Sequence, residues 1–368
     1  MKKKITYSQV GDNYNTKDPV NLLSQQAASK TKNGLESAGF GEVSQTRGES
    51  AFVWRQGNVY MAAVTECLGT KCLIADAMRE VTGKTYYDVI AHDTVATGVN
   101  DLTTVGAKPL VVNAYWSISD NGWLQDKERI KDFINGWKDA CLVSGATWGG
   151  GETSTNKGII KENTVDLAVC VVGIVKPQRR LLTEENIRVN DKILLLRSNG
   201  INANGVSLAR AIASKLPKKY ATKLPSGKLY GNALLQKTNI YAEVVRELFE
   251  KGIDLHYIAN ITGHGLRKVM RAKQPFMYML EHIFPADELF LFMQKHAELS
   301  DYEMYQTFNM GMDYALFLPE KHLKKALEIV RKNHFEGIHA GYVKKGDRQV
   351  VILPKKIVYT SETLRLKQ

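Results

Sequence analysis

The sequence is poor in cysteine and has no long apolar run. Four of its 368 residues are cysteines, and no two of them have the close spacing that is typical of a metal site. No stretch approaches the roughly 20 apolar residues that a membrane-spanning helix needs. The N-terminus is basic, but no apolar segment follows it, so we predict no secretory signal. These absences favour a cytoplasmic protein with reduced thiols and no membrane partner.

Low-complexity segments, short repeats and dense basic blocks are also missing. The net charge is +12, but the lysines are spread along the chain and no nucleic-acid-binding module is present. We therefore expect no nucleic-acid partner. A solvated basic surface that attracts phosphorylated metabolites explains the charge. Hydrophobic residues make up 44% of the chain and charged residues 24%, which is typical of packed globular domains.

Strand-like and helix-like segments alternate along the chain, which predicts an α/β fold of the α+β type in two domains, each with a mixed sheet. We place the N-terminal domain at residues 1–177 and the C-terminal domain at 178–368, because the charged segment 177–190 has no strong period. The predicted strands are 59–65, 109–116, 165–175, 192–196 and 349–353. The predicted helices are 126–143, 232–249 and 319–332, and two more begin near Tyr86 and Val206.

A candidate phosphate loop, Glu66–Lys71, follows the first of these strands. It combines a carboxylate, a glycine, a hydroxyl and a lysine. Backbone N–H groups can hold phosphate oxygens in such a loop, while the lysine offsets their charge. The loop lacks the Walker pattern, and taken alone an ordinary tight turn is its simpler interpretation.

The helix that begins near Tyr86 carries a polar stripe of Asp93, Thr97, Asn100 and Asp101. Offsets of four, seven and eight residues place these groups along one side of the helix. Carboxylate and amide oxygens are the ligands that magnesium prefers. A solvated polar face and a magnesium site both remain open for this stripe.

Three further segments are rich in glycine or amide residues. In Gly149–Thr153 the glycines allow the backbone to approach a ligand closely, and the following Glu-Thr pair can hold a metal or a ribose. Asn199–Gly205 and Asn260–Gly265 each precede a predicted helix, whose N-terminus is a natural anion site. His264 is the one histidine inside a glycine loop. A structural and a catalytic role both remain open for it.

In this order, the segments resemble the phosphoribosylformylglycinamidine cyclo-ligase family. The resemblance extends from Tyr7 to Leu353. Its most specific stretches are Val99–Leu102, Gly106–Leu110, Gly150–Thr153, Asn204–Leu208, Thr262–Gly265 and Met304–Asn309. The wider superfamily includes selenophosphate synthetase, thiamine-monophosphate kinase and formylglycinamidine ribonucleotide synthetase. The Asn-Gly-x-Ser-Leu and Thr-Phe-Asn-x-Gly segments favour the cyclo-ligase branch.

The resemblance implies an ATP- and magnesium-dependent ligase that closes the imidazole ring of formylglycinamidine ribonucleotide in purine biosynthesis. ATP would phosphorylate the formyl amide oxygen. The amidine nitrogen would then attack and expel phosphate, giving aminoimidazole ribonucleotide, ADP and phosphate. The resemblance also implies an active cleft between the domains and a homodimer formed through the N-terminal sheet, whose open edge needs a cover.

The resemblance also implies roles for individual residues. The implied metal ligands are Glu66, Asp93, Asp101 and Glu152. The implied ATP and phosphate contacts are Gly69, Thr70, Lys71, Asn100, Gly151 and Thr153. The implied substrate contacts are Asn204, Gly205, Ser207, Thr262, Gly263 and Asn309. The implied catalytic residues are Lys71, Asp101 and His264.

The chain departs from the family pattern in two loops. Glu66–Lys71 replaces the family's Asp-Gly-Val-Gly-Thr-Lys, and so has a longer acid and one glycine fewer. Ser154–Lys157 replaces Ala-Glu-Met-Pro, and so lacks an acid. Two alternatives therefore stay open. One is an ATP-dependent paralogue that phosphorylates a different amide, carbonyl or phosphate group. The other is a non-catalytic nucleotide-binding regulator, against which the four retained acids argue.

Overall fold

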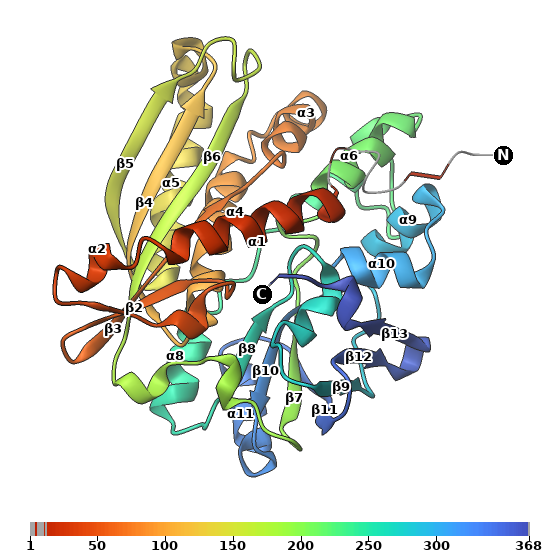
Figure 1. Ribbon diagram of the computed structural model, residues 1–368. Coiled ribbons are helices and arrows are strands. Elements are labelled where there is room, and N and C mark those ends of the chain that lie inside the picture. Colours follow the sequence, from red (N-terminus) through yellow and green to blue (C-terminus); the bar gives the residue numbers. More distant parts are fainter. Residues whose placement is uncertain (1–3, 6–10, 12, 367–368) are drawn as a thin grey trace.

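Two β-sheets organise the chain (Figure 1). The computed structural model describes residues 4, 5, 11 and 13–366, so Tyr7, where the family resemblance begins, lies outside the described residues. The first sheet has the order β1-β2-β3-β6-β4-β5. Its strands are β1 (Gly41–Glu42), β2 (Phe52–Gln56), β3 (Val59–Cys67), β4 (Lys108–Ile118), β5 (Thr147–Thr155) and β6 (Val165–Val175).

The second sheet belongs to the C-terminal half and has the order β13-β12-β9-β11-β7-β10-β8. Its strands are β7 (Lys192–Arg197), β8 (Tyr257–Asn260), β9 (Phe276–Leu280), β10 (Met312–Leu318), β11 (Gly337–Lys345), β12 (Gln349–Ile352) and β13 (Ile357–Thr360). Each sheet contains one parallel pair, β4 with β5 and β9 with β12, among antiparallel pairs. The prediction of two mixed sheets is therefore confirmed.

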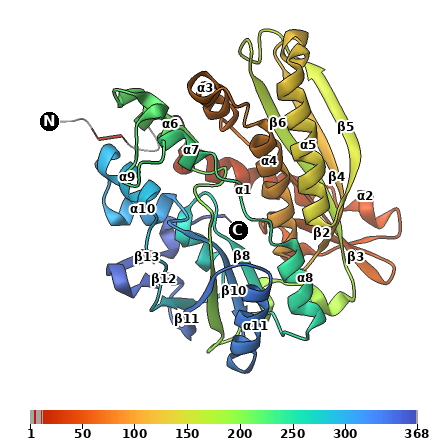
Figure 2. The same ribbon diagram turned by 180° about the vertical axis from the view of Figure 1, so that it is seen from behind.

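Helices cover one face of the first sheet. The helices of the N-terminal half are α1 (Tyr14–Ser29), α2 (Asn33–Glu36), α3 (Cys72–Thr82), α4 (Tyr87–Thr103) and α5 (Lys127–Ser144). Figure 2 shows α4 and α5 on the same side of the sheet. Buried and less buried residues alternate strictly along β6, which explains this packing. Val169 and Val171 are buried beneath α4, while Cys170 between them is only partly buried. Gly98 allows the close approach, since a Cβ atom there would lie 2.7 Å from Val171.

The second sheet is packed on both faces. Its helices are α6 (Val206–Lys215), α7 (Tyr230–Leu234), α8 (Ala242–Glu250), α9 (Glu288–Ala297), α10 (Asp301–Thr307) and α11 (Glu320–Lys332). Leu194 and Leu196 of β7 pack with the apolar faces of α8 and α11, whereas Ile193 and Leu195 join the larger core on the other side. The continuous apolar run of this strand follows from burial on both faces.

One long helix of the prediction is wrong. The stretch 232–249 is not continuous, because α7 ends at Leu234 and α8 begins at Ala242. The backbone of the intervening segment forms hydrogen bonds with side chains of α4 instead of forming a helix. The Thr238 N–H donates to Asp93 (2.8 Å) and the Tyr241 N–H donates to Asn100 (3.0 Å). The helix expected after Asn260–Gly265 is a short 3-10 helix, Gly265–Met270.

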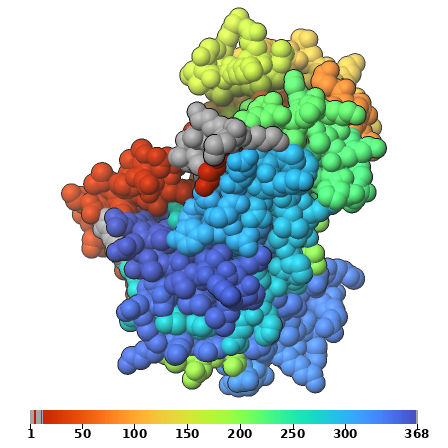
Figure 3. Space-filling view, turned by 90° about the vertical axis from the view of Figure 1, so that its right-hand side faces the viewer, coloured from red at the N-terminus to blue at the C-terminus, as the bar shows by residue number. Residues whose placement is uncertain are grey.

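Helix α1 links the two halves of the molecule. It crosses the front of the junction between the two sheets in Figure 1. In the space-filling view of Figure 3, the red N-terminal segment lies beside the blue C-terminal segments. Tyr14 and Asp18 contact His264, and the Gln25 side chain donates to the Leu366 carbonyl (3.1 Å). The start of the chain therefore packs on the C-terminal half, although its own sheet begins at β1.

Two further features of the described chain concern membrane-spanning helices and the cysteines. Among the residues that the structure describes, no helix combines the length and apolar character needed to cross a bilayer. All four cysteines are free thiols, and burial raises the pKa of the Cys72 and Cys141 thiols, the latter to about 11. These thiols are therefore structural packing groups.

Candidate active site at the domain junction

The polar stripe of α4 faces the C-terminal domain and not solvent. Asp93, Asn100 and Asp101 are all buried. Asn100 has a partner for its nitrogen and for its oxygen, because its NH2 group donates to the Asn239 carbonyl (2.7 Å) and its oxygen accepts from the Tyr241 N–H. A buried polar group needs such partners. The stripe therefore fastens one domain to the other, and the interpretation as a solvated face is wrong.

Lys71 and Asp93 form a buried ion pair at one end of this stripe. Their Nζ and Oδ2 atoms lie 2.5 Å apart, and both side chains are fully buried. The same ammonium donates to the carbonyls of Asn202 (2.9 Å) and Gln236 (3.2 Å). An ammonium group has three hydrogens, so every donor of Lys71 has a partner. In this arrangement the side chain holds two C-terminal loops and does not face an open site.

Glu66 and Asp101 form a second charged group, at the other end of the stripe. Asp101 accepts from the Asn260 amide (2.7 Å) at the end of β8. Burial raises the pKa of Glu66 from its ordinary 4.5 to about 8, and repulsion by Asp101 and a hydrogen bond with it add to that shift. Two carboxylates that share one small space in this way are a ready cation site.

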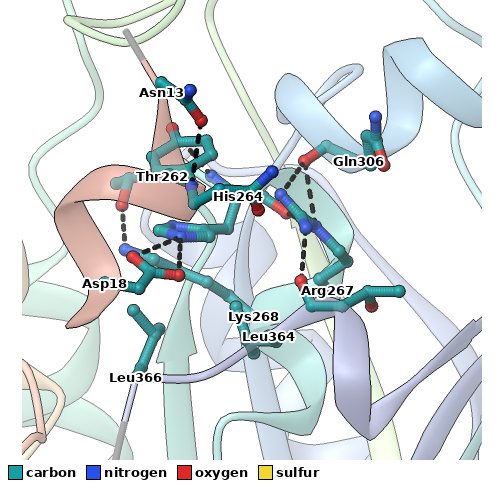
Figure 4. Close-up of polar contacts among 12 residues, drawn as sticks. Asn13, Asp18, Thr262, His264, Arg267, Lys268, Gln306, Leu364 and Leu366 are labelled. Atoms are coloured by element: carbon teal, nitrogen blue, oxygen red, sulfur yellow. Dashed lines mark hydrogen bonds and ion pairs between the residues drawn. The ribbon is translucent and has the colours of Figure 1, made fainter. Parts of the chain in front are cut away.

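Lys268 interacts electrostatically with the two carboxylates. It belongs to the 3-10 helix that follows the Thr262–Gly265 loop, and its ammonium donates to the Thr262 hydroxyl (Figure 4). Burial lowers the pKa of Lys268 to about 8, while attraction to Asp101 and Glu66 opposes that effect. Two acids and one base from opposite domains therefore meet here.

The two glycine loops of the C-terminal half touch one another. The Asn204 side-chain oxygen accepts from the Gly263 N–H (3.0 Å). Gly205 adopts the left-handed conformation (φ 69°), and a Cβ atom there would overlap the Phe308 ring. The Asn309 amide donates to the Gly200 carbonyl (2.9 Å) and to Asp313 (3.0 Å), and these bonds hold the Asn199–Gly205 loop against β10.

His264 is covered by α1. Its ring stacks on Tyr14 with 3.6 Å between the ring centroids, and its Nε2 atom lies 3.3 Å from both carboxylate oxygens of Asp18 (Figure 4). Burial lowers the pKa of His264, although Asp18 opposes that shift. A polar cavity of about 760 Å³ borders the same helix and is lined in part by Arg267, Gln306 and Thr307.

Glu152 does not join the other predicted metal ligands. It pairs with Tyr115 of β4, which pairs with Ala168 of β6, which in turn pairs with Cys67 of β3. Because neighbouring residues of a strand point to opposite faces, Glu66 and Glu152 lie on opposite sides of the sheet, three strand spacings apart. Asp93 is also unavailable, since its oxygens bind Lys71 and the Thr238 N–H. The predicted set of four metal acids therefore does not converge, and only Glu66 and Asp101 meet.

The remaining predicted contacts lie in three places. Gly69 and Thr70 border the start of α3, where the buried Thr70 hydroxyl has no hydrogen-bond partner within the described chain. Ser207 lies in the first turn of α6, beside Gly205. Gly151 and Thr153 lie on the edge strand β5, where Gly151 must be glycine because a Cβ atom would meet the Ala114 carbonyl at 2.1 Å.

Three important groups were missed by the sequence analysis, Lys268, Asp313 and Tyr14, and Asn260 was named only as the start of the Asn260–Gly265 loop. Asp313 is fully buried, and burial raises its pKa to about 7 although Asn202, Tyr241 and Asn309 hydrogen-bond to it. Its signal was an acid inside an otherwise apolar strand. Lys268 carried no comparable signal, because a lysine one turn beyond a glycine loop is usually solvated.

Known families match both halves of the chain. Residues 48–175 match the N-terminal domain of AIR synthase related proteins, and residues 188–354 match the C-terminal domain of these proteins. The phosphoribosylformylglycinamidine cyclo-ligase of Methanosarcina acetivorans is 34% identical over 74% of this chain and 78% of its own length. That of Methanobrevibacter smithii is 31% identical over 89% of this chain and 91% of its own. The chain belongs to the phosphoribosylformylglycinamidine cyclo-ligase family. Cyclo-ligases are ATP-dependent ligases that form C–N bonds, so the chain is an enzyme of that class.

Solved structures share the fold of this cyclo-ligase at much lower identity. A thiamine monophosphate kinase from Aquifex aeolicus superposes with a TM-score of 0.55 at 15% identity, over 84% of this chain and 91% of that one. The T. maritima PurL complexed with FGAR superposes with a TM-score of 0.57 at 14% identity, over 86% of this chain and 48% of that one. These similarities establish the two-domain architecture alone.

Proposed function

We propose that this family member closes the imidazole ring of formylglycinamidine ribonucleotide with ATP at the junction of its two domains. The observation that carries the proposal is the Glu66–Asp101 pair, which lies on the helix-covered side of the first sheet and meets the second domain through Asn260. The fold neighbours support ATP as the phosphoryl donor, because one was solved with ATP and another with the ATP analogue AMPPCP.

The donor set at this pair suits magnesium. Two carboxylates are the protein ligands that magnesium commonly uses, and the rest of its shell comes from water and substrate phosphates. Glu66 and Asp101 would hold the ion, which would neutralise phosphate charge. Asp93 and Glu152 are left out of this set. Glu66 is one methylene longer than the family's aspartate, and its carboxyl interacts with Asp101.

The protein's own contribution is positioning and neutralisation of charge. Gly69 and Thr70 would approach the phosphates, and the Asn204–Gly205 and Thr262–Gly263 loops would frame the ribonucleotide. Lys71 would act through the loops that it holds. Once the formyl amide oxygen carries the phosphoryl group, the amidine nitrogen attacks the formyl carbon. The bond between that carbon and the phosphorylated oxygen then breaks. Phosphate then leaves and the ring is closed.

The divergent Ser154–Lys157 segment lies away from this centre. Ser154 and Asn156 hydrogen-bond to Tyr115 and Ser117 on the face of the sheet opposite to Glu66, and Lys157 is exposed. Loss of the family's acid there leaves the Glu66–Asp101 pair unchanged. This location favours the cyclo-ligase over a paralogue with a different substrate.

The test is to incubate the enzyme with ATP, magnesium and formylglycinamidine ribonucleotide. We expect the aromatic amine product and ADP in equal amounts. ADP without the amine would indicate a paralogue with another acceptor, and bound nucleotide with neither product would indicate a regulator.

We also infer a homodimer formed through the first sheet, within the cytoplasm. The edge strand β5 is largely exposed, and the sheet face that α4 and α5 leave uncovered carries partly exposed apolar groups such as Ala63 and Val172. An exposed edge and an apolar face of this kind call for a partner. Light scattering should give twice the 41.2 kDa mass of the chain at micromolar concentration. A mass of one chain would contradict the inference.

A further inference from the structure

Lys268 is a buried cation to which neither the family resemblance nor the proposed reaction assigns a role. Only 8% of its surface is exposed. It belongs to the C-terminal domain, yet the charges that act on it are those of Asp101 and Glu66 of the N-terminal domain and of the neighbouring Arg271. A lysine is rarely buried unless it is paired, so its position requires an explanation.

A single backbone segment holds this lysine and one of the acids in register. The Asn260 amide donates to Asp101 (2.7 Å), and two residues later the Thr262 hydroxyl accepts from Lys268 (Figure 4). The acid and the ammonium are therefore anchored to the same short stretch at the end of β8. Any movement that separates them must break one of these two hydrogen bonds.

The neighbouring cation has other partners. The Arg271 guanidinium donates to the Gly48 carbonyl (2.8 and 3.1 Å) and the Ser50 hydroxyl (2.8 Å), and it pairs with Glu49. Within the described residues, the hydroxyl of Thr262 is the one hydrogen-bond acceptor of the Lys268 ammonium. Lys268 is therefore the cation whose charge is available to the Glu66–Asp101 pair.

We propose that Lys268 is a tethered cation that balances the Glu66–Asp101 pair and weakens its binding of a free divalent ion until nucleotide is present. This inference rests on the proposed role of the pair as the magnesium site. A fixed positive charge repels an incoming cation at short range. Nucleotide phosphates bring negative charge and further oxygen ligands, which offset that repulsion. The ion and the nucleotide would thus bind together.

The experiment measures Mn²⁺ binding to the nucleotide-free enzyme at neutral pH by the electron paramagnetic resonance signal of the unbound ion. Lys268→Gln should bind Mn²⁺ about tenfold more tightly than the wild type, or better. Lys268→Arg, which keeps the charge, should bind as weakly as the wild type. Lys355→Gln removes one charge from a half-buried ion pair with Asp301 and should also behave as the wild type. Circular dichroism melting verifies that each variant is folded.

Two controls separate the inference from the proposed function. With a non-hydrolysable ATP analogue bound, the difference between wild type and Lys268→Gln should shrink. Asp101→Asn should abolish Mn²⁺ binding both in the wild type and in Lys268→Gln. If Asp101→Asn weakens binding but Lys268→Gln does not strengthen it, the inference about Lys268 is overturned while the metal assignment stands. If Asp101→Asn binds Mn²⁺ as the wild type does, the metal assignment fails and the inference fails with it.

Discussion

Lys71 and Lys268 are both buried cations at the domain junction, but among the described residues only Lys71 has a full set of hydrogen-bond partners. Lys71 makes an ion pair of 2.5 Å and two hydrogen bonds to carbonyls, whereas Lys268 has a hydroxyl partner and two acids that carry other interactions. A saturated buried pair fixes a structure, because breaking it leaves an uncompensated charge. A buried cation with few partners beside a carboxyl of raised pKa is typical of a functional site. The comparison therefore divides the junction into two regions. The latch is the Lys71–Asp93 pair, which holds the domains together, and the reactive centre is Glu66, Asp101 and Lys268.

The largest expected effect separates these two regions by activity. Asp101→Asn keeps the size of the side chain and an oxygen that can accept from Asn260, but it removes the charge that a magnesium–nucleotide complex needs. We expect turnover to fall by about 10³-fold or more with little change in melting temperature. Asp166→Asn, at an exposed position of β6, is the matched control and should keep full turnover. Wild-type turnover in Asp101→Asn would remove this residue from the site.

The next effect concerns the latch. Lys71→Met leaves Asp93 buried and unpaired, so we expect a loss of about 3–5 kcal/mol in the free energy of unfolding, measured with urea. The double variant Lys71→Met, Asp93→Leu should recover part of that loss, because no charge is left unpaired. We also expect Lys71→Ala to weaken nucleotide binding or phosphoryl transfer through displaced loops. Unchanged stability in Lys71→Met would contradict the latch.

A third prediction uses the pH dependence of the centre. The pKa of Glu66 is raised from 4.5 to about 8, so the folded state holds a proton that the unfolded chain has released. Stability should therefore fall as the pH rises from about 4.5 to about 8, and Glu66→Gln should remove this part of the slope. Urea titrations of the metal-free enzyme across this range test the sign. A steeper loss of stability in Glu66→Gln would contradict it.

The smallest effect lies outside both regions. A hydrogen bond that the His256 ring donates to Asp191, and to a lesser extent the charge of Asp191, raises the pKa of His256. This stabilisation is complete below the ordinary pKa of histidine, near 6.5, and is lost as the pH rises through the higher folded value. His256→Asn should therefore destabilise the protein slightly at pH 6 and less at pH 8. Equal losses at both pH values would show that the ring acts by packing alone.

The sequence predicts regular elements of this fold well and the wiring of its centre poorly. The apolar run 165–175 predicted β6 with its observed ends, and the polar stripe of α4 lies on one helix as expected. Residues 235–241 were assigned to a helix together with their neighbours, but the backbone N–H groups of Thr238 and Tyr241 donate to Asp93 and Asn100 instead. Such long-range competition is invisible to local periodicity.

Which of the predicted metal acids lie close together depends on the register of the first sheet. A sequence motif cannot tell which face of β5 carries Glu152, because a register shift at Val112–Asn113 intervenes between β4 and β5. Nor can it tell that Lys268 turns inward beneath the Thr262 loop. The two predicted metal ligands that the structure brings together, Glu66 and Asp101, come from one strand end and one helix, β3 and α4.

The central claim is that this enzyme transfers the phosphoryl group to the formyl amide oxygen and expels that oxygen as phosphate. The most direct measurement uses formylglycinamidine ribonucleotide labelled with ¹⁸O at the formyl oxygen, with ATP and magnesium, followed by mass spectrometry of the phosphate released. The account predicts one ¹⁸O atom in each phosphate for every ring closed. Unlabelled phosphate formed alongside aminoimidazole ribonucleotide would contradict it.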